Sequence, residues 1–87
     1  MTFKIKIHKK AMKFIEKQDA VQRKRIITAI YALPLIGDVS KVEGYENVYR
    51  LRVGDYRVIF SIDLINETFS LINVTDAGNR GDIYKRY

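Results

Sequence analysis

The stretch of sequence that decides the fold is YRLRVGDYRVIF, residues 49–60. On both sides of Gly54-Asp55, a pair typical of tight turns, apolar and polar residues alternate. This period of two is the one expected of a β-strand that buries one face. We therefore expect segments 48–53 and 56–62 to pair as an antiparallel hairpin.

The same alternation predicts which face of the hairpin each side chain occupies. Arg50 and Arg52 alternate with the apolar residues of the first strand, and Arg57 with those of the second. If the apolar side chains pack on a core, all three guanidinium groups project from the opposite face. Like charges on neighbouring strands repel each other, so this arrangement favours a binding function over a stabilising one. The alternative is a solvated face with scattered partners such as Asp55 or Glu67.

Two further strands extend the hairpin. Residues 3–8 alternate in the same way, and residues 68–74 do so after a turn at 63–67. The last three predicted strands follow one another as an antiparallel meander. With the first strand, they predict a four-stranded, mainly antiparallel sheet.

Between the first strand and the hairpin, the apolar period changes to that of a helix. Residues 9–18 and 19–33 carry apolar side chains at helical spacing, Asp19 is a suitable N-cap for the second helix, and Pro34 ends it. Two short helices joined by a few residues are expected to form an antiparallel hairpin on one face of the sheet.

The remaining segments complete the predicted fold. Residues 35–46 are typical of a loop and residues 75–80 of an irregular tail, while Asp82 is placed to cap a short helical turn over 83–87. The predicted fold class is α+β, in a single domain spanning 1–87, with the N-terminal helix hairpin packed on one face of the sheet.

Composition narrows the possible partners. The chain has 16 Lys and Arg against 10 Asp and Glu, a net charge of +6, which suits a nucleic acid or an acidic protein segment. It has no cysteine, so disulfides, thiolate metal sites and cysteine nucleophiles are excluded. No apolar run approaches the roughly 20 residues of a membrane span. We expect a soluble, cytoplasmic protein without a membrane partner.

Ordinary catalytic groups are scarce in the sequence. His8, the single histidine, ends a predicted strand among lysines and is interpreted as a solvated residue, not a general base. Ser61 and Ser70 have no nearby histidine with which to form a triad. No cluster of carboxylates indicates a metal site, so we predict neither metal nor other cofactor. Any catalysis must depend on Arg, Lys and Tyr.

The C-terminal tail offers a second group of basic and aromatic residues. If the tail folds across the open face of the sheet, it brings Arg80 and Tyr84 to the three strand arginines. Lys85, Arg86 and Tyr87 then supply the mixture of cations and aromatic rings expected where phosphates pair and bases stack. We predict that these last three residues bind RNA.

Over nearly its whole length, the chain resembles the RelE/ParE toxin superfamily. The resemblance rests on FIEK at 14–17, VSKVEGYENVY at 39–49, the stretch at 49–60 and NRGDIY at 79–84. It implies a toxin of a type II toxin–antitoxin system. One branch of the superfamily consists of mRNA interferases that act in the ribosomal A site, and another poisons DNA gyrase.

In the RNA-cleaving branch, the resemblance assigns catalytic roles to Arg50, Arg52, Arg57, Arg80 and Tyr84. The reaction is attack of an RNA 2′-hydroxyl on the adjacent phosphate, without a metal. Arg50 or Arg52 would orient or deprotonate the hydroxyl, and Arg57 would neutralise charge on the phosphoryl oxygens. Arg80 would assist the leaving oxygen, and Tyr84 would stack on or orient a nucleotide.

The closing segment departs from the family pattern His-Arg-Arg-Asp-Val-Tyr. Asn79 stands in place of the histidine and Gly81 in place of the second arginine. Asparagine cannot exchange a proton as histidine does, and arginine, with a pKa above about 12, is a poor general base. Positioning and electrostatics would then carry most of the rate.

The resemblance also implies a cognate antitoxin, for which we predict an acidic, partly disordered segment that wraps the chain. It would pair with the basic segment 4–25 and lay apolar groups near Ile27 and Tyr31, which otherwise simply widen the core face of the second helix. Operator DNA is expected as a partner only through the antitoxin complex. Three functions stay open: a ribosome-dependent endoribonuclease, which we favour, a gyrase poison, and a degenerate toxin that acts only as antitoxin partner and co-repressor.

Overall fold

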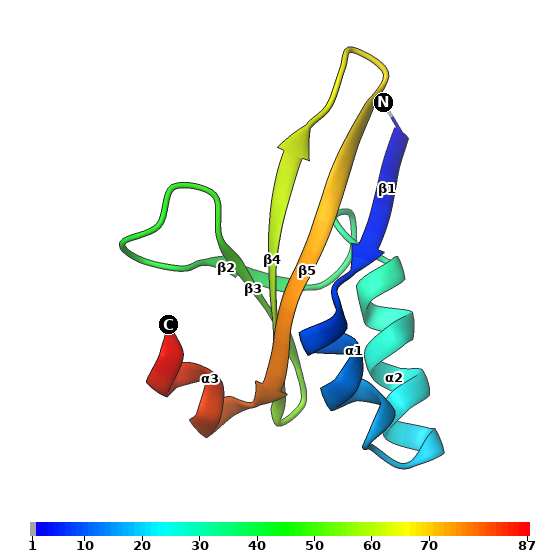
Figure 1. The fold of residues 1–87 in the computed structure, drawn as a ribbon, viewed down its shortest axis with the longest axis vertical. Coiled ribbons are helices and arrows are strands. Elements are labelled where there is room, and N and C mark those ends of the chain that lie inside the picture. Colours follow the sequence, from blue (N-terminus) through cyan, green and yellow to red (C-terminus); the bar gives the residue numbers. More distant parts are fainter. Residues whose placement is uncertain (1) are drawn as a thin grey trace.

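The computed structural model describes residues 2–87 and shows one sheet with helices on both faces (Figure 1). In chain order, the elements are β1 (Thr2–Ile7), α1 (Lys9–Glu16), α2 (Ala20–Tyr31), β2 (Asp38–Lys41), β3 (Tyr49–Val53), β4 (Tyr56–Leu64), β5 (Phe69–Asn79) and α3 (Arg80–Arg86).

The sheet has five strands in the order β1-β5-β4-β3-β2, parallel between β1 and β5 and antiparallel elsewhere. The α+β class and the β3–β4–β5 meander are confirmed. The prediction of four strands is wrong, because it omitted β2. This strand has four residues, all exposed at the edge of the sheet, so it carries no apolar period that would distinguish it from a loop.

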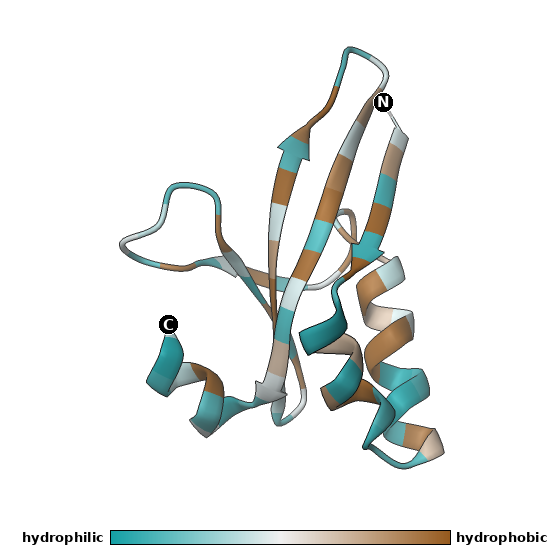
Figure 2. Cartoon of the chain, viewed as in Figure 1, coloured by the Kyte–Doolittle hydropathy of each residue, from teal (hydrophilic) through white to brown (hydrophobic). Residues whose placement is uncertain are grey.

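Helices α1 and α2 lie together on one face of the sheet and cover the main core (Figure 1). The fully buried side chains of this core come from both helices and from three strands: Ala11, Ile15, Ile26, Ile30, Leu51, Val58, Phe60, Ile72 and Val74. The predicted N-cap is confirmed, since the Asp19 carboxylate accepts a hydrogen bond from the Gln22 amide at 2.9 Å. Figure 2 shows the alternation of apolar and polar residues along the strands that builds this face.

Strand β5 is longer than its sequence pattern predicts. The predicted strand ended at residue 74, whereas β5 continues to Asn79. The pairing with β4 shifts between Ile59 and Phe60, which oppose Asp76 and Val74 respectively, so that Thr75 is an extra, bulged residue. A bulge inverts the alternation beyond it. The tail looked irregular in sequence because its period of two is interrupted at this residue.

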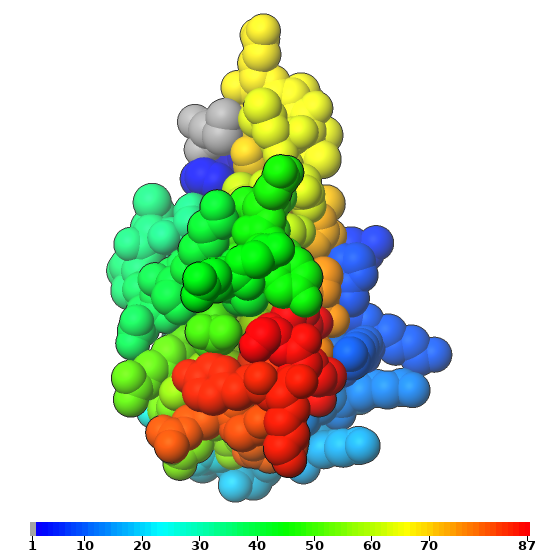
Figure 3. Space-filling model, turned by 90° about the vertical axis from the view of Figure 1, so that its left-hand side faces the viewer, coloured from blue at the N-terminus to red at the C-terminus, as the bar shows by residue number. Residues whose placement is uncertain are grey.

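The second face of the sheet is covered at one end by α3 and by the segment that joins β2 to β3 (Figure 3). A small apolar cluster of Val42, Ile59 and Ile83 lies beneath them. The tail therefore folds across this face, as expected, but the predicted boundaries were wrong. Helix α3 begins at Arg80 with Asn79 at the N-cap position, so Asp82 lies inside the helix and does not cap it.

We call the two sides of the sheet the helix-hairpin face, covered by α1 and α2, and the α3 face. No helix in the described part of the chain is long and apolar enough to cross a membrane.

Candidate functional site

Four arginines and one tyrosine gather on the α3 face and form what we call the arginine site: Arg50, Arg52, Arg57, Arg80 and Tyr84. Strands β3 and β4 place the first three, since Arg52 and Arg57 are register partners and Arg50 precedes them by two residues on the same face. The chain then passes through β5 into α3, which brings Tyr84 over the strands. The sequence-predicted faces of β3 and β4 agree with this placement.

Arg57 is the fixed centre of the arginine site. We expected its guanidinium to project outward, but Arg57 is only 3% exposed because α3 lies over it. Its Nη1 donates to the backbone carbonyls of Gly54 at 2.7 Å and Tyr56 at 2.8 Å, and its Nε donates to the Tyr84 hydroxyl oxygen at 3.2 Å. These bonds hold the charge in one orientation without neutralising it.

Tyr84 lies over two of the arginines while keeping 48% of its surface exposed. The Cζ atom of Arg50 is 4.8 Å from the centre of the Tyr84 ring, and that of Arg57 is 5.7 Å away, both in cation–π range. The hydrogen bond from Arg57 lowers the pKa of the Tyr84 phenol, partial burial opposes this, and the positive charges nearby, Arg80 included, lower the pKa further.

The remaining arginines are more open. Arg52 and Arg80 are exposed, and the backbone amide of Arg80 donates to the Asp55 carbonyl at 2.9 Å, which joins the start of α3 to the β3–β4 turn. Arg50 is half-buried, and its Nε atom is buried with no hydrogen-bond partner. A buried donor without an acceptor is unusual in a folded protein.

Among the described residues, no carboxylate forms an ion pair with an arginine of this site. Residues 2–87 contain two ion pairs, one between Lys10 and Asp76 and one between Arg86 and Asp76. Asp55 and Glu67, the partners considered for a solvated face, make no ion pair in the described chain. The same part of the chain has no group of three His, Cys, Asp or Glu side chains that could hold a metal ion.

Comparison with known proteins agrees with this geometry. The family model described as the ParE toxin of the type II toxin–antitoxin system, parDE, matches residues 5–79. The chain belongs to the RelE/ParE superfamily of toxins. It is thus a toxin of a type II toxin–antitoxin system. The matched region ends where α3 begins, so Arg80 and Tyr84 lie beyond it.

Solved structures similar to this toxin are toxin–antitoxin complexes. The RelE–RelB complex from Pyrococcus horikoshii matches with 30% identity and a TM-score of 0.68, over 93% of this chain and 98% of that chain. The RelB–RelE complex from Methanococcus jannaschii matches with 28% identity and a TM-score of 0.66, over 93% and 96%. The RelBE2 complex from Mycobacterium tuberculosis, 12% identical, shares the fold, with a TM-score of 0.63 over 87% and 95%. No protein of curated function matches the sequence.

The rest of the toxin's tail is divided between solvent and the protein. Lys85 is exposed, whereas Arg86 and Tyr87 turn inward to Asp76. The sequence pattern gives no indication of this contact with Asp76. The prediction that RNA binds Lys85, Arg86 and Tyr87 stays a prediction. Arg86 and Tyr87 in addition bind Asp76 within the protein.

His8 has a partner that its sequence position does not reveal. It is half-buried, and its Nε2 lies 2.8 Å from the side-chain oxygen of Asn73, so it is less solvated than we predicted. Asn73 in turn donates to Asp63 at 2.6 Å. This polar chain lies outside the arginine site and makes no contact with Tyr84.

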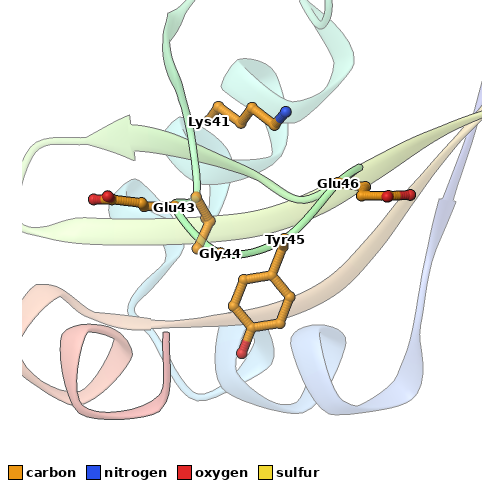
Figure 4. A pocket seen from close by; sticks show the side chains of 6 residues that line it. Lys41, Glu43, Gly44, Tyr45 and Glu46 are labelled. Carbon is orange, nitrogen blue, oxygen red and sulfur yellow. The ribbon is translucent and has the colours of Figure 1, made fainter.

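The segment between β2 and β3 borders a shallow depression lined by residues 41–46 (Figure 4). Tyr45 projects from it and contacts the ring of Tyr87, with 6.1 Å between ring centres. Through this contact, the segment supports the end of α3.

On the other side of the molecule, α2 leaves an apolar groove beside β3. The residues that line the groove are Val21, Lys24, Arg25, Thr28, Ala29, Ala32, Ile36 and Val53. Of the two residues predicted to contact an antitoxin, Tyr31 is 62% exposed, while Ile27 packs partly against the core.

Proposed function

We propose that this toxin is an endoribonuclease that cleaves mRNA in the A site of the ribosome and needs no metal for the reaction. One observation carries the proposal: four arginines that have no carboxylate partner among residues 2–87 share a face with a half-exposed phenol, and three of them, Arg57, Arg50 and Arg80, lower the pKa of that phenol. Fixed positive charges of this kind suit the phosphate of an RNA transition state, in which negative charge accumulates on the phosphoryl oxygens.

In the proposed reaction, the 2′-hydroxyl oxygen attacks the adjacent phosphorus while the bond from phosphorus to the 5′ oxygen breaks. The products are a 2′,3′-cyclic phosphate and, once the leaving oxygen takes a proton from water, a 5′-hydroxyl. Arg57, held by two carbonyls, would bind the phosphoryl oxygens, and Arg50, which contacts the Tyr84 ring, would orient the attacking hydroxyl. Arg52 and Arg80 are exposed and would bind the phosphate backbone of the RNA, with Arg80 beside the leaving oxygen.

Tyr84 is the proton acceptor in this scheme. The arginines keep their protons at any physiological pH because their pKa lies above about 12. Tyr84 differs in that its pKa is below its ordinary value, so a larger share of phenolate is present at a given pH. Its exposed ring would still stack on a nucleotide.

The test removes two of the arginines and follows growth and transcripts after induction. Replacing both Arg57 and Arg80 with Ala should abolish growth arrest and mRNA cleavage on translating ribosomes. Lys41→Ala is the matched control, since Lys41 is an exposed cation on β2 outside the arginine site. Undiminished cleavage by the double variant would refute the proposal.

A second candidate function is poisoning of DNA gyrase without RNA cleavage. It is favoured by the match to the ParE toxin model and by the absence of the family histidine and second arginine at Asn79 and Gly81. In that case, induction would cause double-strand breaks while transcripts stay intact. If induction is harmless but the antitoxin complex shifts its own promoter, the chain is a co-repressor.

We propose in addition that an acidic, partly disordered antitoxin segment binds the groove beside α2. The similar solved structures contain RelE bound to RelB. The groove is lined mostly by apolar residues, and its two cations, Lys24 and Arg25, make no ion pair among residues 2–87, which favours an acidic amphipathic partner. Val21→Asp should weaken binding of the cognate segment in calorimetry, and binding that ignores added salt would contradict the electrostatic part.

A further inference from the structure

Asp76 is a buried carboxylate that faces the α3 side of the sheet. It is 1% exposed. The pairing of β1 with β5 ends at Val74, so at Asp76 the edge of β5 that faces away from β4 has no strand beside it. The bulge at Thr75 accounts for its direction. Without the extra residue, the alternation that buries Ile72 and Val74 under the helix hairpin would turn residue 76 into the same core.

Asp76 connects α3 to the sheet by a two-point interaction. The guanidinium of Arg86 donates from Nε to Oδ2 at 3.0 Å and from Nη2 to Oδ1 at 3.2 Å, the fork geometry in which an arginine fixes both distance and direction. The Tyr87 hydroxyl also donates to Oδ2, at 3.3 Å. From α1, Lys10 places its Nζ 3.3 Å from the same oxygen.

Helix α3 has few other means of staying in place. It has seven residues, too few to be stable alone, and Ile83 is its one buried side chain. Ile83, Arg86 and Tyr87 are three and four residues apart, so they share one face of the helix, which lies against the sheet. Gly78 admits this close approach, since a Cβ there would lie 3.3 Å from Ile83 and 3.4 Å from Arg86.

Tyr84 follows Ile83 directly in α3. The contacts that fix the sheet-facing side of this helix therefore also determine the position of Tyr84. We propose that Asp76 is a positioning residue of the arginine site: by fixing Arg86 and Tyr87, it sets the position and rotation of α3 and so holds Tyr84 over Arg50 and Arg57. The consequence for RNA cleavage rests on the function proposed above, whereas the placement of Tyr84 does not.

The placement is tested by the pKa of Tyr84 in the folded toxin, measured by NMR with tyrosine labelled at Cζ and assigned with Tyr84→Phe. Asp76→Asn keeps the shape of the side chain and removes its charge. We expect it to raise the pKa of Tyr84 toward the ordinary value of about 10, because the hydrogen bond from Arg57 is lost when α3 shifts. Glu67→Gln, an exposed carboxylate on the β4–β5 turn, should leave that pKa unchanged.

A second variant approaches the same contact from the surface. Arg86→Gln buries nothing new and should shift the pKa of Tyr84 in the same direction, with Lys41→Gln as the control for loss of one cation. If the role of Asp76 is merely structural, the variants should lower the free energy of unfolding and leave the pKa of Tyr84 in the folded molecules unchanged. An unchanged pKa in both variants would overturn the inference.

Activity provides the third measurement. If the toxin cleaves RNA, Asp76→Asn should lower kcat by roughly ten- to a hundredfold with a smaller change in KM, since a small misplacement of a reacting group costs about that much. A toxin that does not cleave RNA, yet shows the Tyr84 shift, would overturn the proposed function and leave the positioning role standing. If the toxin cleaves RNA but the pKa of Tyr84 is unchanged in both variants, the proposed function stands and the positioning role of Asp76 is overturned.

Discussion

On the helix-hairpin face, α1 and α2 bury a continuous set of apolar side chains, whereas on the α3 face three buried apolar residues share the surface with four arginines and a buried carboxylate. The first face derives its stability from burial and needs no particular charge. The second places uncompensated cations side by side and holds them with backbone carbonyls and a short helix. We infer that stability and function are separated between the two faces.

Equal truncations on the two faces test this separation most strongly. Ile30 and Ile83 are both fully buried, the first on α2 and the second on α3. Ile30→Ala should cost about 2–5 kcal/mol of unfolding free energy because it leaves a cavity in the main core. Ile83→Ala should cost less than about 2 kcal/mol, because we expect this short helix with one buried side chain to open locally before the domain unfolds. Urea denaturation measures both.

Activity should show the opposite ranking for the same two variants. Folded Ile30→Ala toxin should keep its activity, and folded Ile83→Ala toxin should lose most of it because Tyr84 is displaced. Equal activity losses per folded molecule would mean that the two faces are not separate in function.

The phenol of Tyr84 gives the next largest effect. Tyr84→Phe keeps the ring over Arg50 and removes the oxygen that accepts from Arg57. We expect a loss of about a hundredfold in RNA cleavage, the range of a lost proton acceptor, with unfolding free energy almost unchanged. A rate equal to that of the unmodified toxin would leave Tyr84 with a stacking role alone.

The anchor of α3 should respond to acid. Burial raises the pKa of Asp76, but its hydrogen bonds with Arg86 and Lys10 and the charges of both lower it by more, to below the ordinary 3.8. Asp76 therefore binds protons more readily in the unfolded chain, so it stabilises the fold fully above about pH 4. This contribution is lost as the pH falls through the lowered pKa. The NMR signals of Arg86 and Tyr87 should show a transition in that acidic range, and this transition should be missing in Asp76→Asn.

The smallest predicted effect concerns Gly81 in the first turn of α3. A Cβ there would meet no atom within 4 Å, and its backbone has no positive φ, so alanine fits. Gly81→Ala should stabilise α3 by about 0.5–1 kcal/mol, because glycine loses more conformational freedom on entering a helix. Protection of the α3 amides from hydrogen exchange measures this gain.

The helix-hairpin face could be predicted from the sequence because its information is local. The period of two in residues 49–60 and the helical spacing of Ile26 and Ile30 each follow from neighbouring residues. The strands of the meander and the N-cap at Asp19 were found in this way. Strand β2 was missed because four exposed residues produce no period.

The α3 face could be predicted only in part. The alternation of Arg50, Arg52 and Arg57 with apolar residues indicated their common face, but the burial of Arg57 depends on where α3 lies. Asp76 was not recognised as an anchor, because its partner Lys10 is distant in sequence and the bulge at Thr75 hides the strand. Long-range contacts of this kind leave no periodic signal.

The most direct test of the central claim, that the α3 face cleaves RNA, is the chemistry of the ends it produces. Purified toxin is added to ribosomes translating a defined mRNA, and the new termini are analysed for the unmodified toxin and for Arg50→Ala. We predict 2′,3′-cyclic phosphate and 5′-hydroxyl ends with the unmodified toxin, and at least about a tenfold loss in the variant. Intact mRNA, together with broken DNA in the presence of gyrase, would contradict the account.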